Sequence, residues 1–407
     1  FILFKTDSVS ICYRPLFLSI VICYHNIIAM TKYFNFEVNN MKKIEMYVNT
    51  PVKGKLPEQF NDENYKKVQE YHKSLAVYEP TPLVSLDALA KELGVKAVYL
   101  KDESKRFGLN AFKALGASYA VGNILKNMDP AKTPVFVTAT DGNHGRAVAW
   151  AAAQAGYKSV VFMPKGTAQC RVDAIHQVSD AEVTVTDLNY DDAVRLATAY
   201  AKEHNGYLVQ DTGFEGYEEI PWDITLGYTH MAAEAADQLG ETVPTHVFLQ
   251  AGVGSMAGGV LGYLTDRYGS DSFKTSIMEA YDAACIFDSV KQGKLVASGG
   301  NPETIMAGLN CGEANIFTFP VLRDFAEYFF KLPDYVTKEG MRKLSEAGVV
   351  AGECGAVGTG LLMNLCGKEE FAEMRKQMGL DENSVVLLFS TEGNTDPDSY
   401  ERIVNAK

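Results

Sequence analysis

Short apolar runs alternate with segments of helical periodicity from Thr81 onward. The apolar runs predict buried strands at 97–100, 135–138, 159–163, 182–185, 207–209, 246–250, 275–278 and 385–389. The segments between the earlier strands predict helices at 111–125, 145–155, 168–178 and 191–204. This alternation is typical of an α/β protein with parallel or mixed sheets and right-handed crossovers. Such sheets bind ligands beyond the C-terminal ends of their strands, so the residues after each strand are the candidates for function.

A lysine at the start of a predicted helix is the first candidate for chemistry. The strand at 97–100 leads through a polar segment to Lys113, and small residues follow in the helix. A helix N-terminus and burial both disfavour a charged amine, so this position favours the neutral, nucleophilic form of Lys113. Taken alone, the pattern fits an ordinary surface lysine better, and the other motifs have to decide between the two.

Polar residues also follow the strands at 135–138 and 207–209. The first of these strands is followed by Thr140, Asp141, Gly142, Asn143 and His144. Backbone N–H groups at the helix start that follows predict a cradle for an anion. The alternative is an ordinary helix capped by Asp141 or Asn143. Asp211 follows the second strand, and the pattern leaves open whether it is a turn residue or a catalytic carboxylate.

A glycine-rich loop follows the strand at 246–250. The backbone amides of residues 252–256 can surround a phosphate at the N-terminus of the next helix. The spacing Gly252-x-Gly254-x-x-Ala257, with Glu279 after the next strand, also fits the dinucleotide fingerprint of an NAD-dependent oxidoreductase. That alternative puts the fingerprint after several β/α units instead of at the first strand, and it gives Lys113 no role.

Composition excludes several classes of partner. The net charge of −13 argues against nucleic acid, because phosphate binding needs clustered cations. The seven cysteines show no C-x-x-C pair, so neither a metal site nor a disulfide framework is predicted. Cys285 and Cys311 can approach each other, but free thiols in a reducing cytoplasm are favoured.

The apolar segment 1–29 has no clean cleavage site and is predicted to be non-native upstream or disordered sequence. No other segment is long enough to span a membrane.

Several motifs, taken in their order along the chain, resemble one family of enzymes. They are Asn-x-Phe-Lys ending at Lys113, Thr-Asp-Gly-Asn-His-Gly at 140–145, the glycine loop, and Ser-x-x-Gly-x-x-Asp at 390–396. Together they resemble the fold type II, or tryptophan-synthase-β-like, pyridoxal-phosphate enzymes, which include threonine dehydratase and cysteine synthase. Within this group the chain resembles the diaminopropionate ammonia-lyases, from about Tyr78 to the C-terminus. Further matching strings lie at 101–113, 163–166 and 189–192.

The resemblance implies a carbon–nitrogen lyase that depends on pyridoxal 5'-phosphate (PLP). Its reaction would be an α,β-elimination that converts 2,3-diaminopropionate and water into pyruvate and two molecules of ammonia. Lys113 would form the Schiff base, Asn143 would contact the phenolic oxygen of the cofactor, and Ser390 would face its ring nitrogen. The phosphate would bind the backbone amides of Gly252, Val253, Gly254, Ser255 and Met256.

The resemblance also suggests which residues face the substrate. Family members that dehydrate serine or threonine carry a small residue at the position of Asp141, and a second ammonium group is better accommodated by carboxylates. Asp141 and Asp211 are therefore expected to be catalytic acid/base groups, one for each enantiomer's α-proton. Thr140, Gly142 and His144 would hold the α-carboxylate, although His144 fits a structural role equally well. A serine/threonine dehydratase of the same fold is the alternative function.

The expected architecture has two α/β domains with the active site between them. Residues 30–116 and 224–407 would form a large cofactor-binding domain. Residues 117–223 would form a smaller, mobile domain that closes over the substrate and excludes water. The family resemblance also suggests a homodimer.

Overall fold

The computed structural model describes residues 42–129, 131, 133–140, 142–298 and 303–406. Residues 44–407 form one compact unit, which contains two separate β-sheets. The segment 1–29, which the sequence predicts to be non-native or disordered, lies outside the described residues. Among the helices that the structure describes, none has both the length and the apolar character that crossing a membrane requires.

The larger sheet is mixed. Its strands are β1 (Glu45–Val48), β2 (Leu83–Ser85), β3 (Ala97–Asp102), β8 (His246–Gln250), β9 (Lys274–Ala280), β10 (Tyr328–Leu332) and β11 (Val385–Ser390). They lie in the order β1-β10-β9-β8-β11-β3-β2. The strands from β10 to β3 pair in parallel, whereas the edge strands β1 and β2 pair antiparallel to their neighbours. The parallel strands therefore all end at the same edge of the sheet, as a shared site requires.

The smaller sheet is entirely parallel. Its strands are β4 (Val135–Ala139), β5 (Lys158–Met163), β6 (Glu182–Val185) and β7 (Tyr207–Leu208), in the order β6-β5-β4-β7. All four lie where the sequence predicts strands, so the predicted alternation is confirmed here. The sequence pattern misses β1 and β2, because short edge strands with partly exposed side chains carry little periodic signal.

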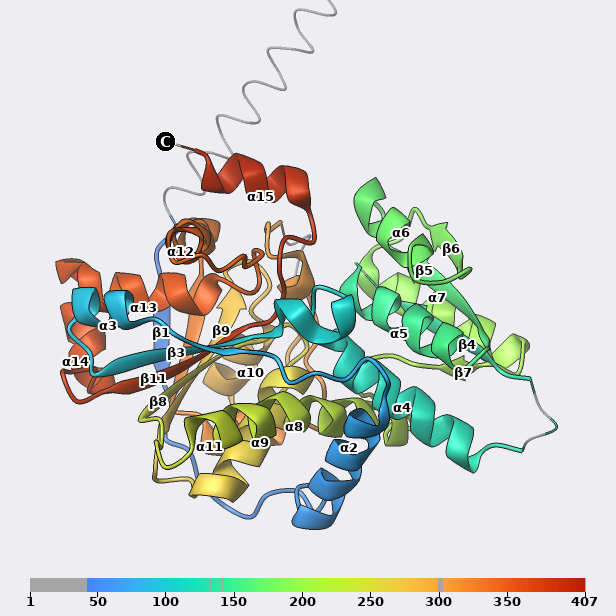
Figure 1. The fold of residues 1–407 in the computed structure, drawn as a ribbon, viewed down its shortest axis with the longest axis horizontal. Coiled ribbons are helices and arrows are strands. Elements are labelled where there is room, and N and C mark those ends of the chain that lie inside the picture. Colours follow the sequence, from blue (N-terminus) through green and yellow to red (C-terminus); the bar gives the residue numbers. More distant parts are fainter. Residues whose placement is uncertain (1–41, 130, 132, 141, 299–302, 407) are drawn as a thin grey trace, which may run out of the picture. The chain divides into compact units, whose positions relative to one another are not determined.

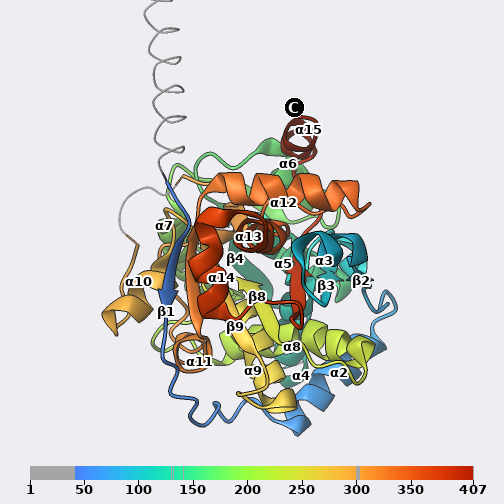
Figure 2. The ribbon, with the colours of Figure 1, turned by 90° about the vertical axis from the view of Figure 1, so that its left-hand side faces the viewer.

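Helices cover both faces of the larger sheet (Figure 1). On one face, α4 (Lys113–Asn127), α8 (Glu219–Leu239) and α9 (Ser255–Tyr268) share a core with Leu249, Ile277 and Leu387. On the other face, α12 (Asp334–Glu346) and α13 (Val357–Gly367) share a core with the alternate strand residues Phe248, Met278 and Leu388. Figure 2 shows the strands between these two layers. The period of two along each strand thus builds both cores.

The other helices complete these layers and surround the smaller sheet. They are α2 (Asp62–Ser74), α3 (Asp87–Leu93), α5 (Asn143–Gln154), α6 (Gln169–His176), α7 (Tyr190–Glu203), α10 (Cys285–Gln292), α11 (Phe319–Phe325), α14 (Ala372–Met378) and α15 (Pro397–Val404). Three short 3₁₀ helices are η1 (Glu103–Gly108), η2 (Ala307–Leu309) and η3 (Glu369–Phe371). The missed strand β10 begins soon after the apolar helix α11, which obscures its start in the sequence pattern.

Packing determines where α4, the helix of the first candidate lysine, lies. It contacts α8 on the side of the larger sheet and α5 on the side of the smaller one. Gly227 of α8 allows this close approach, since a Cβ there would lie 2.6 Å from the carbonyl oxygen of Leu115. The helix begins at Lys113, two residues later than the predicted segment 111–125, because Ala111 forms an isolated β-bridge with Glu392. This bridge fastens the start of α4 to the segment after β11.

Candidate active site

The ends of strands from both sheets converge on one pocket. Of the residues predicted for the site, it is lined by Lys113, Thr140, Asn143, His144, Asp211, Gly252, Val253, Gly254, Ser255 and Met256. Sequence reasoning assigned no role to several others that line it, namely Tyr190, Gln250, Asn310, Cys311, Cys354, Thr391 and Glu392. Residues far apart in the chain therefore meet here, as the rule for strand ends predicts.

Lys113 is tied to a carboxylate. Its side chain is 19% exposed, and Nζ donates a hydrogen bond to Asp211 Oδ2. Burial lowers the pKa of Lys113, but the charge of Asp211 and this hydrogen bond raise it by more, so the pKa lies above that of an ordinary lysine. The sequence expectation of a neutral amine is wrong for this state, because it left out the partner charge. Any reaction of Lys113 as a nucleophile must first pass its proton on.

Asp211 follows β7 and is almost completely buried. Its main-chain oxygen accepts a hydrogen bond from Ser255 Oγ at 2.5 Å, which links the end of the smaller sheet to the glycine loop. Burial raises the pKa of Asp211, but the charge that His144 gains in acid, the charge of Lys113 and the hydrogen bond from Lys113 lower it to about 2. At neutral pH this side chain is therefore a carboxylate, which can accept a proton.

His144 uses one ring nitrogen on the main chain. Nε2 lies 2.8 Å from the carbonyl oxygen of Val209, so Nε2 carries the hydrogen in the neutral ring. Nδ1 lies 3.8 Å from Asp211 Oδ2. Burial lowers the pKa of His144, so the ring is neutral near pH 7. The nitrogen on the side of Asp211 is then an acceptor, which favours the structural alternative for His144 over carboxylate binding.

Asn143 and Glu392 form a second polar pair in the pocket wall. Asn143, the first residue of α5, donates from Nδ2 to Glu392 Oε2 at 2.5 Å. The other oxygen of Glu392 accepts from the backbone N–H of Cys354 at 3.0 Å. Glu392 is buried, and it holds the Asn143 amide in one orientation. Its place in the Ser-Thr-Glu-Gly string after β11 was the available signal for this residue.

Two other predicted residues lie apart from the pocket wall. Ser390, at the end of β11, is fully buried and does not line the pocket, while the next residue, Thr391, does. Gly142 precedes α5, and its backbone N–H donates to Thr140 Oγ1 at 2.9 Å. Asp141 lies outside the described residues. The roles expected of these residues stay predictions.

The glycine loop before α9 can bind an anion. Gly254 precedes the helix with a φ of 96°, and residues 252–256 all line the pocket. The first N–H groups of a helix have no acceptor within it and carry positive partial charge. Residues 252–256 therefore present N–H groups and a helix N-terminus to one site, as a phosphate requires.

The dinucleotide alternative for this loop fails at Glu279. The sequence places Glu279 after the strand, where it would reach a ribose, but it lies inside β9 and is buried. Its two carboxylate oxygens accept from the backbone N–H groups of Ile286 and Phe287, at 2.8 and 2.6 Å. The carboxylate thus belongs to the start of α10, so Glu279 is not available to a ribose as the predicted fingerprint requires.

The described cysteines form no disulfide with one another. They are Cys170, Cys285, Cys311, Cys354 and Cys366. Cys285 and Cys311 are therefore not bonded to each other, which is the alternative that the sequence favours.

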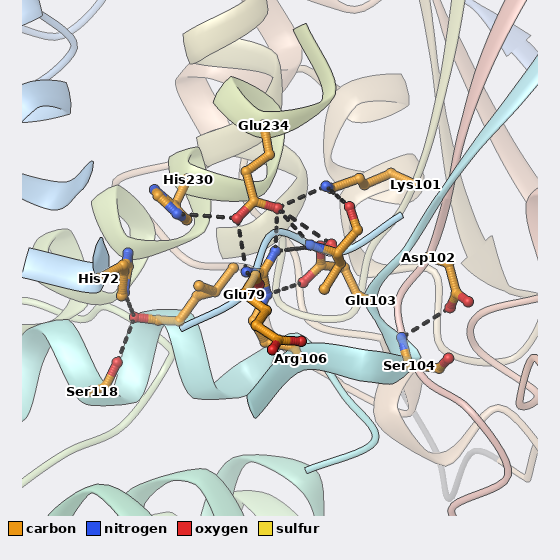
Figure 3. A network of polar contacts seen from close by, with 12 residues as sticks. His72, Glu79, Lys101, Asp102, Glu103, Ser104, Arg106, Ser118, His230 and Glu234 are labelled. Atoms are coloured by element: carbon orange, nitrogen blue, oxygen red, sulfur yellow. Dashed lines mark hydrogen bonds and ion pairs between the residues drawn. The ribbon is translucent and has the colours of Figure 1, made fainter. Parts of the chain in front are cut away.

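A buried ionic network supports the segment that leads to Lys113 (Figure 3). Arg106 of η1 is fully buried and donates to Glu103 at 2.8 Å and to Glu234 of α8 at 2.7 Å. Lys101 of β3 also donates to Glu234, at 2.7 Å. The network therefore joins β3, η1 and α8 through charges that lie outside the pocket.

Removing Glu234 should destabilise the fold strongly. Glu234→Ala would leave the buried cations Arg106 and Lys101 without their shared carboxylate, and we expect a loss of about 3–5 kcal/mol in the free energy of unfolding. Urea unfolding measures this loss. The control is Glu70→Ala, which breaks the exposed Lys66–Glu70 pair and should cost less than about 1 kcal/mol. Equal losses in both variants would contradict the proposed support.

Residues 75–390 match the pyridoxal-phosphate dependent enzyme family, and the chain belongs to that family. The diaminopropionate ammonia-lyase of Escherichia coli (strain K12) is 44% identical over 385 residues, which cover 89% of this chain and 96% of that protein. A crystal structure of the Escherichia coli enzyme, in complex with an aminoacrylate-PLP azomethine reaction intermediate, is similar with a TM-score of 0.84 at 44% identity; the match covers 89% of this chain and 97% of that chain. The biosynthetic L-threonine dehydratase of Haemophilus influenzae is 28% identical over 224 residues, which cover 54% of this chain and 40% of that protein. The expected fold type II architecture is thereby confirmed.

The pocket fits PLP, the cofactor of this family. Lys113 would hold the aldehyde carbon, and the amides of residues 252–256 would hold the phosphate. Asn143 donates only one of its two amide hydrogens to Glu392, so the other suits the phenolic oxygen of the cofactor.

Gly254→Ala should weaken cofactor binding by about tenfold. A left-handed backbone costs a residue with a Cβ roughly 1–2 kcal/mol, so we expect the loop to relax in the cofactor-free variant, and PLP binding must restore it. The new Cβ would also lie 3.0 Å from side-chain carbons of Ile286 and Leu322. Absorbance titration of cofactor-free protein with PLP measures the affinity. Gly54→Ala is the matched control, since a Cβ there meets nothing within 4 Å. Unchanged affinity in Gly254→Ala would contradict the phosphate assignment.

Proposed function

We propose that this protein converts 2,3-diaminopropionate and water into pyruvate and two molecules of ammonia. The observation that carries the proposal is 44% identity to the Escherichia coli diaminopropionate ammonia-lyase across nearly the whole of both chains. The match to the threonine dehydratase covers only 54% of this chain. The function of the first relative is therefore the better supported of the two.

The charges in the pocket suit a substrate with two ammonium groups. Asp211 and Glu392 both line the pocket, and Lys113 is the only lysine or arginine among its described lining residues. The sequence predicts that Asp141 adds a further carboxylate to the pocket. A hydroxyl substrate such as serine has one ammonium group and needs fewer carboxylates. These carboxylates favour the diamine.

We assign the steps to residues as follows. PLP, when bound, supplies the electron sink for the pair left by a broken Cα–H bond. Asp211 accepts the α-proton of one enantiomer, and Asp141 accepts that of the other. Thr140 Oγ1 accepts from Gly142 N, so its own proton is available to hold the α-carboxylate. Ser390 is assigned to the ring nitrogen by family resemblance alone.

We further propose that residues 117–223 act as the mobile domain and close over the substrate. The strands of the smaller sheet all lie within this range, while those of the larger sheet lie outside it. Closure would exclude water while charge develops in the pocket.

We also propose that the protein is a homodimer in the cytoplasm. The dimer is proposed on family resemblance, and the cytoplasm on the absence of paired cysteine spacing in the sequence. Light scattering coupled to size-exclusion chromatography tests the dimer.

A substrate comparison tests the function. Pyruvate would be measured with the L and D enantiomers of 2,3-diaminopropionate and of serine, and 2-oxobutyrate with L-threonine. We expect kcat/KM for diaminopropionate to exceed that for serine and threonine by roughly 100-fold or more, since buried charges that pair with the second ammonium are left unpaired by a hydroxyl. Faster turnover of L-serine or L-threonine would instead identify a dehydratase.

A further inference from the structure

A buried asparagine joins the glycine loop, residues 252–256, to the segment that carries Asp211. Asn315 lies shortly before α11, is fully buried, and lies outside the described lining of the catalytic pocket. Its backbone N–H donates to the carbonyl oxygen of Val253 at 2.7 Å. The backbone N–H of Ile316 donates to the carbonyl oxygen of Gly213 at 3.4 Å. The main chain at Asn315 therefore contacts both parts of the site.

Hydrogen bonds fix the orientation of the Asn315 side chain. Its Oδ1 accepts from the backbone N–H of Phe317 at 2.9 Å, and a backbone N–H can only donate. Nδ2 is therefore the atom that faces Ser255 Oγ, to which it donates at 2.8 Å. Ser255 Oγ in turn donates to the main-chain oxygen of Asp211 at 2.5 Å, because a carbonyl oxygen can only accept. The three residues thus form a directed chain of hydrogen bonds from Asn315 through Ser255 to Asp211.

This chain of hydrogen bonds is enclosed in the protein. Ser255 and Asp211 are buried, as Asn315 is. Hydrogen bonds are electrostatically stronger in such surroundings, and a satisfied buried network holds one arrangement. Gly213 leaves room for it, since a Cβ there would lie 2.8 Å from Asn315 Oδ1 and would overlap the ring of Phe317. The segment that follows Asp211 is thus shaped around Asn315.

The direction of these bonds decides what Ser255 offers to a phosphate. Its hydroxyl has one proton, which goes to Asp211, so the backbone N–H groups of the glycine loop are left to hold the phosphate. Ser255 therefore serves two parts of the site. Its main chain begins α9, whereas its side chain holds the carbonyl group of Asp211.

We propose that Asn315 is a positioning residue that couples the glycine loop to the carboxylate of Asp211. By keeping Ser255 Oγ directed at Asp211, it holds the phosphate-binding amides and the proposed base in one arrangement. The inference rests on the proposed function, because it takes Asp211 as the base for one enantiomer. Since Asn315 is bonded to both parts, its loss should weaken phosphate binding and slow the turnover that depends on Asp211.

The first test measures cofactor binding. Asn315→Leu keeps the branched shape of the side chain and removes its donor. Absorbance titration of the cofactor-free protein with PLP should show an affinity about 3- to 10-fold weaker, the usual worth of one hydrogen bond. Binding of pyridoxal, which lacks the phosphate, should stay within about twofold. Ser255→Ala, a smaller change that breaks the same chain, should give the same pattern.

Asn364→Leu is the matched control for the titrations. Asn364 of α13 is as buried as Asn315, and its Nδ2 donates to Glu339 at 2.7 Å and to the carbonyl oxygen of Gly360 at 2.8 Å. It makes no contact with the glycine loop in these bonds. The control should therefore leave the ratio of PLP affinity to pyridoxal affinity within about twofold of the wild type.

Turnover supplies a second readout. With PLP at saturation, Asn315→Leu should lower kcat about 3- to 10-fold for the enantiomer of diaminopropionate that Asp211→Asn impairs, and leave the other within about twofold. The double variant Asn315→Leu/Ser255→Ala should lose no more than Asn315→Leu alone, because the two residues act through one chain of hydrogen bonds.

Several results would overturn the proposal. Losses that multiply in the double variant would show that Asn315 acts by another route. Equal weakening of PLP and pyridoxal, equal loss of turnover for both enantiomers, or no change in either measurement would leave Asn315 with a general packing role only. Wild-type protein that forms no pyruvate from diaminopropionate would refute the proposed function instead, while the two titrations would still decide whether Asn315 supports the phosphate site.

Discussion

Replacing Lys113 with alanine should abolish turnover of 2,3-diaminopropionate, with kcat falling at least about 1000-fold. Lys113 is the basic side chain of the pocket, begins α4, and is placed by the β-bridge between Ala111 and Glu392. Alanine keeps the helix, because it is the strongest helix former, but removes the amine that would hold the cofactor. The variant should still bind PLP through its phosphate, without the visible absorbance of the lysine-bound cofactor.

Lys126→Ala is the control for this experiment, since Lys126 is exposed in the last turn of the same helix. It should keep both the absorbance and the turnover of the wild type. Borohydride reduction of the wild type, followed by peptide mass analysis, should locate the cofactor on Lys113. A label on another lysine would refute the assignment, as would visible absorbance retained by Lys113→Ala.

Sequence periodicity predicts the strands best where a strand is buried on both faces. It gives the bounds of β8, 246–250, residue for residue, because every residue of that central strand is buried and the apolar run is continuous. The same reasoning ends β9 at residue 278, but the strand continues to Ala280, which pairs with Leu332 of β10. That extension places Glu279 inside the sheet and removes it as the ribose-binding acid of the dinucleotide alternative.

The charge state of Lys113 could not be predicted from its own segment. Its partner Asp211 lies 98 residues further on and follows a strand of the smaller sheet. Only the tertiary packing of the chain brings the Lys113 and Asp211 side chains together. Glu392, which holds Asn143 across 249 residues, is a similar case. Local pattern locates groups at strand ends, but their pairing depends on tertiary packing.

The buried network around Arg106 shows the same limit. The segment 101–113 is rich in charges, which in a sequence indicates a solvated surface. Arg106, Lys101 and Glu103 are instead fully buried, because Glu234 of α8 supplies the compensating charge from 128 residues further along the chain than Arg106. A strongly polar segment next to a candidate catalytic lysine can therefore be a structural support.

Asp211→Asn should lower kcat for one enantiomer of diaminopropionate by about 100- to 10,000-fold, the usual worth of a positioned general base. The amide keeps the shape of the side chain but cannot accept a proton, and it leaves Lys113 without its counter-charge. The matched variant Asp141→Asn should depress the other enantiomer. Initial rates of pyruvate formation from each pure enantiomer measure both effects, and an unchanged ratio between the enantiomers in both variants would contradict the assignment.

The loss of stability in Asp211→Asn, relative to the wild type, should depend on pH. The pKa of Asp211 is lowered to about 2, so its ion pair stabilises the fold above the unfolded pKa of about 4 and loses that effect as the pH falls toward 2. The wild type should therefore be more stable than Asp211→Asn at neutral pH, and the difference in the free energy of unfolding should shrink below about pH 4. Urea unfolding at several pH values measures that difference. A difference that stays constant between pH 7 and pH 3 would mean that the carboxylate is not ion-paired, and Asp211 would then be a polar wall residue instead of the base.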